Sequence, residues 1–188
     1  LAKRANSDYA ALLEHLVLQP MGLDETSIAL DTERQHRFIQ GHDADRQPAS
    51  AWDLTSFAGA GAIRSTASDM LSYLEAQLQA AAFQPKGTTP SSRSLAAALA
   101  RSQTPQADAS GPLKIAYAWL YNTRTGTYWH NGGTGGFSSF AFFNPKGRYA
   151  AIVLVNITLT PRGSFADSLG QHIDDRFAGR QALSLAAW

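Results

Sequence analysis

Short runs of aromatic and β-branched residues alternate with small residues in the second half of the chain, which is the pattern of strands in a sheet. Turn-forming residues separate these runs, most clearly at Asn144-Pro145-Lys146-Gly147. The pattern predicts strands over 115–121, 128–130, 140–143 and 149–155. The last strand contains the continuous apolar run Ala-Ile-Val-Leu-Val, which predicts that it is buried on both faces.

Apolar residues recur at helical spacing near the start of the chain and predict a helix over 7–19. Asn6 or Ser7 can serve as its N-cap, and Pro20 is predicted to end it because proline lacks the amide that a helix interior needs. A second, short helix is predicted over 95–100 from its run of good helix-forming residues.

Two longer helices are predicted from both periodicity and end signals. Thr66 and Asp69 have the spacing of a capping box, which predicts a helix from there to about Ala82 and gives Asp69 a structural role at its N-terminus. Apolar residues four apart predict another helix over 164–177, which would cover one face of the sheet.

The polar segment 31–56 predicts a long irregular excursion. It contains His36 and His42, but their spacing matches no zinc motif, so a solvated loop is favoured over a metal site. Trp52 and Phe57 are predicted to anchor this excursion. Two further surface loops are predicted over 84–94 and 103–111.

Composition bounds the class of protein. A chain of 188 residues with 44% hydrophobic residues predicts a single domain over 1–188, and a formal charge of +1 favours small or neutral partners over nucleic acid. Absence of cysteine excludes disulfides and a cysteine nucleophile, and no apolar run approaches a membrane span. The Gly59-Ala60-Gly61 run lacks the third glycine of a dinucleotide loop, so no cofactor is predicted.

The most informative stretch is His130-Asn131-Gly132-Gly133-Thr134-Gly135-Gly136-Phe137, in which four of five consecutive residues after Asn131 are glycine. It lies between two predicted strands. Glycine allows a positive φ and lets another molecule approach the backbone amides without a Cβ in the way. Periodicity alone is also consistent with a plain glycine hairpin that carries a surface histidine.

Motif order separates these interpretations. His130-Asn131-Gly132, with the following glycine-rich tail and Asn144-Pro145, resembles the third motif of the penicillin-recognising serine hydrolases, which include class C β-lactamases, DD-peptidases and related esterases. Their motif is Lys-Thr-Gly or His-x-Gly on a strand that lines the active site. The segments 20–26 and 65–70 also resemble stretches of this family, and the three matches occur in the family's order.

The resemblance implies an α/β fold of the α+β type, with an antiparallel sheet flanked by helices, β-lactamase/transpeptidase-like and incomplete at its N-terminal side. The family's nucleophile motif Ser-x-x-Lys and its Tyr-x-Asn or Ser-x-Asn motif occur nowhere in the chain. In the family both motifs precede the segment that the start of this chain resembles. We therefore expect a C-terminal portion of a serine hydrolase that is inactive alone, with about three strands and an open, apolar sheet edge.

The resemblance also implies site roles. His130 matches the third-motif cation or hydrogen-bond donor, and Gly133 matches the position whose amide supplies half of the oxyanion hole, so both are candidate catalytic residues. Asn131, whose side chain is expected to face the cleft, and Gly132 and Thr134 are candidate substrate-binding residues. Histidine carries less positive charge than lysine at neutral pH, which favours an esterase-like or peptidase-like relative over an efficient β-lactamase.

The implied partners are a small acyl, ester or β-lactam substrate of the parent protein, and either the missing N-terminal segment or a second copy at the open edge. The resemblance suggests a periplasmic or secreted protein. A non-catalytic module that binds a peptidoglycan-like or acyl ligand is the alternative. A hydrolase using His130 with Ser138 or Ser139 is disfavoured because neighbours in a strand face opposite sides and no orienting carboxylate is evident.

Overall fold

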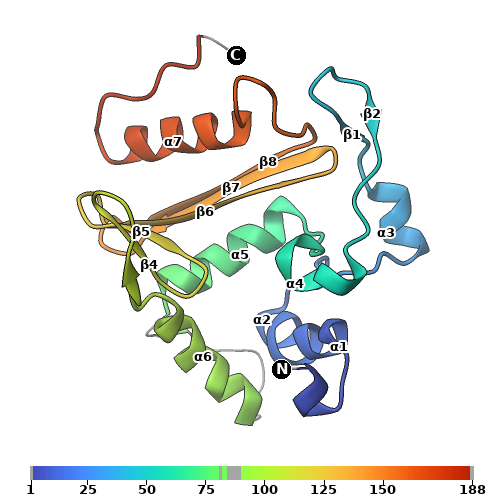
Figure 1. The fold of residues 1–188 in the computed structure, drawn as a ribbon. Helices are drawn as coiled ribbons and strands as arrows, with labels where there is room; N and C mark the ends of the chain where they lie inside the picture. The colour runs from blue at the N-terminus through green and yellow to red at the C-terminus, as the bar shows by residue number, and fades with distance from the viewer. Residues whose placement is uncertain (1, 81, 84–89, 187–188) are drawn as a thin grey trace.

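The computed structural model describes residues 2–80, 82–83 and 90–186, with backbone alone at 90–93. Its centre is one antiparallel sheet whose strands follow each other in chain order, β3 to β8. Helices lie on both sides of this sheet (Figure 1). The expected α+β architecture is therefore confirmed, but the expected count of about three strands is wrong because the sheet has six. The strands are β3 (Ala107–Asp108), β4 (Leu113–Ile115), β5 (Leu120–Asn122), β6 (Thr127–Thr134), β7 (Phe137–Asn144) and β8 (Tyr149–Val155).

The three long strands β6, β7 and β8 pair without a bulge, so side chains alternate between the two faces along their whole length. One face carries Ala141 and Phe143, which pack against Leu74 of α5 (Ala67–Leu78). The other face carries Phe140 and Phe142, which pack with residues of α7 (Phe165–Phe177). We call these the α5 face and the α7 face.

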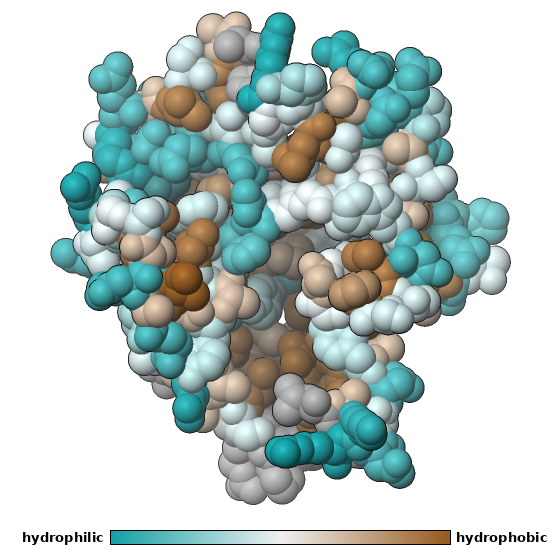
Figure 2. Space-filling view, viewed as in Figure 1, coloured by the Kyte–Doolittle hydropathy of each residue, from teal (hydrophilic) through white to brown (hydrophobic). Residues whose placement is uncertain are grey.

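A third cluster of buried residues lies away from the sheet, where the N-terminal helices meet α6 (Pro90–Ser102). Its buried members are Leu18, Met21, Leu23, Ala76, Ala80, Leu95 and Leu99. Hydrophobic side chains are visible in the hollow between the α6 and α1 regions of the molecule (Figure 2). No helix in the described part of the chain is both long and apolar enough to cross a membrane.

The N-terminal helix departs from the prediction at both ends. A 3-10 turn (Ala2–Ala5) precedes it, and Asp8, not Asn6 or Ser7, caps it by accepting the amide of Ala11. It runs through α1 (Tyr9–Leu13), a π-helical turn η2 (Glu14–Leu18) and α2 (Gln19–Met21), so Pro20 does not end it. The wider π turn removes the usual clash between a proline ring and the carbonyl four residues before it. Gly22, with φ of 69°, ends the helix instead.

The predicted capping of α5 is confirmed. Thr66 is the N-cap, and its hydroxyl accepts the amide of Asp69. The buried carboxylate of Asp69 in turn accepts the amide of Glu25 (3.0 Å) and the hydroxyl of Thr26 (2.7 Å), so it ties this helix end to the turn after α2. The helix ends at Leu78, earlier than predicted.

Short elements occupy segments that were predicted as loops. The prediction that 31–56 is entirely irregular is wrong, because an Asp31-capped helix and a hairpin form there. The predicted loop over 103–111 contains β3, and the predicted helix over 95–100 is the central part of the longer α6. Residues 84–89 of the other predicted loop lie outside the described residues. The new elements are α3 (Thr32–Arg37), β1 (Gly41–His42), β2 (Pro48–Ala49), the 3-10 turn η3 (Thr55–Phe57) and α4 (Ala58–Gly61).

The prediction of a single strand over 115–121 is wrong. The segment is a hairpin of β4 and β5, closed by a bond from the amide of Ala116 to the carbonyl of Trp119 (2.8 Å). Ala118 in the turn has a φ of 62°. Because alanine is rarely found at positive φ, no turn was predicted at this position.

The hairpin of β7 and β8 and the helix α7 form as predicted. However, β8 is the last strand of the sheet, and its Leu154 is 46% exposed, so the prediction that the strand is buried on both faces is wrong. In α7 the buried residues are Ala166, Gly170 and Asp174. Each follows by one position an apolar residue from which the helix was predicted, namely Phe165, Leu169 and Ile173.

Candidate active-site strand

The predicted motif lies on the outer half of β6, where the strand has a neighbour on one side only. β7 pairs with β6 along its whole length, whereas β5 pairs with only its first three residues, Thr127 to Trp129. The four residues from His130 to Gly133 are all exposed. This part of β6 therefore has an open backbone edge, which we call the β6 edge.

The register of the strands determines the direction in which the backbone groups at the β6 edge point. In antiparallel sheets, hydrogen-bonding groups of successive residues point alternately to one neighbouring strand and to the other. The bond between Ala116 and Trp119 fixes this alternation in the β4–β5 hairpin, and the next residue of β5 pairs with Trp129. The N–H and C=O groups of Trp129 therefore point toward β5. Those of Asn131 and Gly133 point to the same side, beyond the point where β5 begins.

His130 lies on the α5 face of the sheet, opposite Ala141 of β7. Its ring is exposed and its Nδ1 is 2.6 Å from the carbonyl oxygen of Asn131. A carbonyl oxygen can only accept a hydrogen bond, so this geometry assigns the proton to Nδ1. In the neutral ring Nε2 then carries a lone pair, which makes it a hydrogen-bond acceptor or a base.

Asn131 has the opposite orientation. Its side chain lies on the α7 face, where Nδ2 donates to Oδ2 of Asp167 in the first turn of α7 (2.7 Å). The side chains of Asn131 and His130 therefore lie on opposite faces of the sheet, as expected for adjacent residues of a strand. At the β6 edge Asn131 presents only its backbone, and its carbonyl oxygen already accepts the His130 ring.

The glycines of the motif have different surroundings. A Cβ on Gly132 would lie 2.9 Å from Oγ of Ser139 on the neighbouring strand, whereas a Cβ on Gly133 would make ordinary contact with Leu159 at 3.5 Å. Thr134 adjoins α4, since its Cγ2 would lie 3.4 Å from a Cβ on Gly61. The structure thus brings His130, Gly132 and Thr134 to one face, with Gly133 between them.

The turn after the motif is held by the segment that contains β1 and β2. The amide of His42 donates to the carbonyl of Gly136, and a Cβ on Gly135 would lie 2.6 Å from the carbonyl oxygen of Ser50. The Trp52 side chain also lies against Gly135, although it remains 55% exposed. Trp52 thus contacts the turn at the end of the site.

Other predictions for this segment have mixed outcomes. Phe57 is 72% exposed, so its predicted anchoring role is wrong. His36 is exposed, and Nδ1 of His42 is 3.1 Å from the carbonyl oxygen of Asn156. No group of three metal-binding side chains occurs within the described residues.

The structure has two further hollows away from the β6 edge. A small polar cavity lies under α7 beside Thr127 and Asp174, and a larger hollow, of about 480 Å³, lies between Arg46 and Phe165. Neither is lined by any residue from His130 to Thr134. Because His130 to Gly133 are all exposed, the candidate site is an exposed strand edge.

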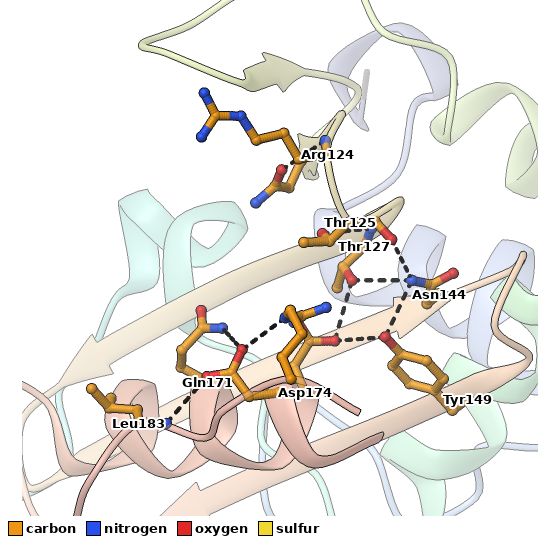
Figure 3. A network of polar contacts seen from close by, with 11 residues as sticks. Arg124, Thr125, Thr127, Asn144, Tyr149, Gln171, Asp174 and Leu183 are labelled. Atoms are coloured by element: carbon orange, nitrogen blue, oxygen red, sulfur yellow. Dashed lines mark hydrogen bonds and ion pairs between the residues drawn. The ribbon is translucent and has the colours of Figure 1, made fainter. Parts of the chain in front are cut away.

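A buried polar network that the sequence did not indicate joins α7 to all three long strands (Figure 3). Oδ1 of Asp174 accepts the hydroxyls of Thr127 (3.2 Å) and Tyr149 (2.9 Å), and its Oδ2 pairs with Arg180 (2.6 Å). Asn144 donates to both hydroxyl oxygens at 3.2 Å. Burial raises the pKa of Tyr149, so this hydroxyl keeps the proton that it donates. The network fixes the end of the sheet that lies away from His130.

Comparisons with known proteins show which proteins this chain is similar to. A β-lactamase family model matches residues 1–173. A D-alanine carboxypeptidase AmpC from Burkholderia cenocepacia is 20% identical, with a TM-score of 0.74 over 94% of this chain and 56% of that chain. A β-lactamase from Sulfitobacter sp. EE-36 is 19% identical, with a TM-score of 0.73 over 94% of this chain and 54% of that chain. A class C β-lactamase is 18% identical, with a TM-score of 0.74 over 89% of this chain and 50% of that chain.

These structural neighbours share the fold, and the chain spans only about half of their length. No protein in the curated set matches significantly. The family model covers nearly all of the sequence, including the β6 motif and most of α7. The chain belongs to the β-lactamase family.

Proposed function

We propose that this chain forms one wall of the acyl-transfer site of a β-lactamase-like serine hydrolase. The observation that carries the proposal is the β6 edge: an exposed strand whose Gly133 amide points outward, in the sequence position of the family's third motif. The family's reaction needs a nucleophile, a base and amide donors for the developing oxyanion. The β6 edge supplies the third of these.

Gly133 is proposed as one of the two oxyanion donors. A substrate acyl group lying along the β6 edge would place its carbonyl oxygen against the Gly133 N–H, and the exposed backbone allows that approach. As the serine oxygen attacks the carbonyl carbon, the C=O bond electrons move to the oxygen, and a fixed amide stabilises that charge. A donor of this kind contributes about 3 kcal/mol to the transition state in a hydrolase of known mechanism.

His130 is proposed to act on the nucleophile's network and not as a fixed cation. Because its Nδ1 proton is directed at the Asn131 carbonyl, the neutral ring of this exposed side chain has Nε2 as its hydrogen-bond acceptor. That orientation suits a hydroxyl that donates to Nε2 while it loses or relays a proton. It suits a substrate carboxylate only when the ring is protonated.

The proposed substrate class is a D-alanyl peptide, a β-lactam or an ester with an acyl group that can lie beside a strand. Structural neighbours described as a D-alanine carboxypeptidase and as class C β-lactamases support this range. Histidine at the position of the motif lysine supports the peptidase-like and esterase-like part of it. No cofactor enters the proposed reaction.

The nucleophile is proposed to come from outside these 188 residues, because no serine in the chain has a lysine three positions later. The purified chain is therefore expected to leave nitrocefin and p-nitrophenyl acetate unhydrolysed above the buffer rate, and intact mass spectrometry is expected to show no acyl adduct.

A nitrocefin turnover accompanied by an adduct of one acyl group on a serine of this chain would overturn the proposal. The matched control is the Ser138→Ala, Ser139→Ala double variant. It tests whether the serines opposite the motif are responsible for any turnover that is seen.

A further inference from the structure

The first turn of α7 is joined to the motif strand by a side-chain hydrogen bond. Ser164 is the N-cap of α7, and its hydroxyl accepts the amide of Asp167, which is the third residue of the helix. The partial positive charge at a helix N-terminus stabilises a carboxylate at this position. Oδ2 of that carboxylate accepts Nδ2 of Asn131, 36 residues earlier in the chain, at 2.7 Å. The start of the helix thus holds one residue of the β6 edge.

The surroundings of Asp167 favour this bond. Its other oxygen, Oδ1, is buried and has no hydrogen-bond partner among the described residues. A carboxylate that is partly removed from water is costly without donors, and a hydrogen bond to a charged group is stronger than one between neutral groups. Loss of the Asn131 donor would leave the carboxylate with less compensation, so we expect the pair to stay formed.

Asn131 is a residue whose backbone needs such support. Its N–H and C=O groups point to the side where β5 no longer pairs with β6, and two glycines follow it directly. Glycine has more backbone freedom than any other residue, so this part of the strand is weakly restrained by its own sequence. A side chain fixed at Asp167 restrains the peptide plane between Asn131 and Gly132.

The same peptide plane carries the acceptor for His130. The carbonyl oxygen of Asn131 is 2.6 Å from Nδ1 of His130, which assigns the proton of the neutral ring to Nδ1. Rotation of the plane would remove this acceptor, and the ring could then carry its proton on either nitrogen. The direction of the Asn131 carbonyl therefore determines which nitrogen of His130 is the acceptor.

We propose that Asp167 is a positioning residue for the β6 edge. Through Asn131 it fixes the peptide plane that sets the tautomer of His130 and keeps the Gly133 amide directed outward. Asp167 lies on the α7 face, opposite to His130, and acts only through Asn131. The Asn131 side chain then positions the strand, and its backbone meets the ligand. The inference rests on the proposed function only in treating the β6 edge as the acyl-binding wall.

The first readout is the tautomer of His130, measured by ¹⁵N NMR of the imidazole in the full chain at a pH where the ring is neutral. The parent chain is expected to carry the proton mainly on Nδ1. In Asp167→Ala the ratio of the Nδ1-protonated to the Nε2-protonated ring is expected to fall at least about threefold, which corresponds to the loss of a hydrogen bond of ordinary strength.

The second readout is the backbone ¹⁵N order parameter from Asn131 to Gly133. Rigid backbone gives values of about 0.85, and flexible backbone gives values below about 0.6. We expect the parent chain to be near the rigid value here, although the edge is open. In Asp167→Ala these residues are expected to fall toward the flexible value, whereas Thr127 to Trp129, which pair with β5, are expected to keep theirs.

Three variants separate positioning from a general loss of stability. Asp167→Asn keeps an oxygen acceptor for Asn131 and is expected to preserve both readouts. Gln171→Ala is the matched control one turn further along α7, where the side chain bonds to Asp175, and it is expected to change neither readout. Asn131→Ala removes the same bond from the strand side, so it is expected to reproduce Asp167→Ala and serves in its place if that variant does not fold.

The double variant of Asp167→Ala and Asn131→Ala is expected to match either single variant, because both remove one interaction. Additive effects would overturn the proposal. So would an unchanged His130 tautomer ratio, or unchanged order parameters, in a folded variant that lacks the bond. Neither readout uses a ligand, so failure of this inference is distinguishable from failure of acyl binding at the β6 edge.

Discussion

Replacing Asp174 with alanine is expected to lower the free energy of unfolding by about 2–4 kcal/mol, the largest effect of a single polar side chain that the structure implies. The carboxylate is buried and accepts the hydroxyls of Thr127 and Tyr149. Without it both hydroxyls lose their acceptor in a region that water does not reach freely. Arg180 is partly exposed and keeps its pairing with Asp175, so the loss of the ion pair adds less.

Urea denaturation followed by circular dichroism measures this change. Asp108→Ala is the matched control, since Asp108 pairs with Lys114 at the surface and its side chain is 83% exposed. We expect the control to unfold at the same urea concentration as the parent chain. Equal midpoints for the Asp174 variant and the parent would show that the network in Figure 3 does not hold α7 on the sheet.

Gly170→Ala is expected to destabilise the chain by about 1–3 kcal/mol, even though alanine is the better helix former by about 1 kcal/mol. A Cβ at this position in α7 would lie 2.7 Å from Cγ of Phe140. Phe140 is only 6% exposed and stacks on Trp129 at 5.4 Å, so its ring has no room to retreat. The clash therefore exceeds the gain in helix propensity.

The control for this prediction is Gly59→Ala in α4, where the new Cβ would meet only Cζ of Tyr9, at 3.9 Å. We expect this control to be neutral or slightly stabilising. Thermal unfolding of the two variants in parallel distinguishes a packing effect from a propensity effect. An unchanged midpoint for Gly170→Ala would mean that α7 can move away from β7 at no cost.

The sequence predicted the hairpin of β7 and β8 because its local signals agree, whereas it predicted only 128–130 of β6 (Thr127–Thr134) as a strand. Alternating aromatic and small residues define β7, and the Asn-Pro-Lys-Gly turn fixes its hairpin with β8. The motif on β6 could be assigned because histidine, glycine spacing and the following turn occur together. Local signals of this kind act over a few residues and do not depend on the rest of the fold.

Other features depend on tertiary context that the sequence pattern does not carry. Ala118 takes a positive φ without being glycine, so the β4–β5 hairpin gave no turn signal. The π-helical turn before Pro20 lets the helix continue where proline normally ends it. The contact between Asn131 and Asp167 joins residues 36 apart in sequence, and only the position of α7 on the sheet reveals it.

The site prediction illustrates the same division. The sequence placed His130 and Gly133 together because they are close in the chain, and the structure exposes both at the β6 edge. It could not separate the faces of His130 and Asn131 by resemblance alone, although strand alternation already implies that they differ.

The most direct test of the proposed function is an NMR titration of the chain with N-acetyl-D-alanyl-D-alanine, which maps the amides that respond. The account predicts that the largest shift changes occur from His130 to Thr134. It also predicts that Gly133→Ala, which keeps the amide, preserves binding, whereas Gly133→Pro, which removes the amide, abolishes it. Changes centred elsewhere in the chain, or equal binding by both variants, would contradict the claim that the β6 edge is the acyl-binding wall.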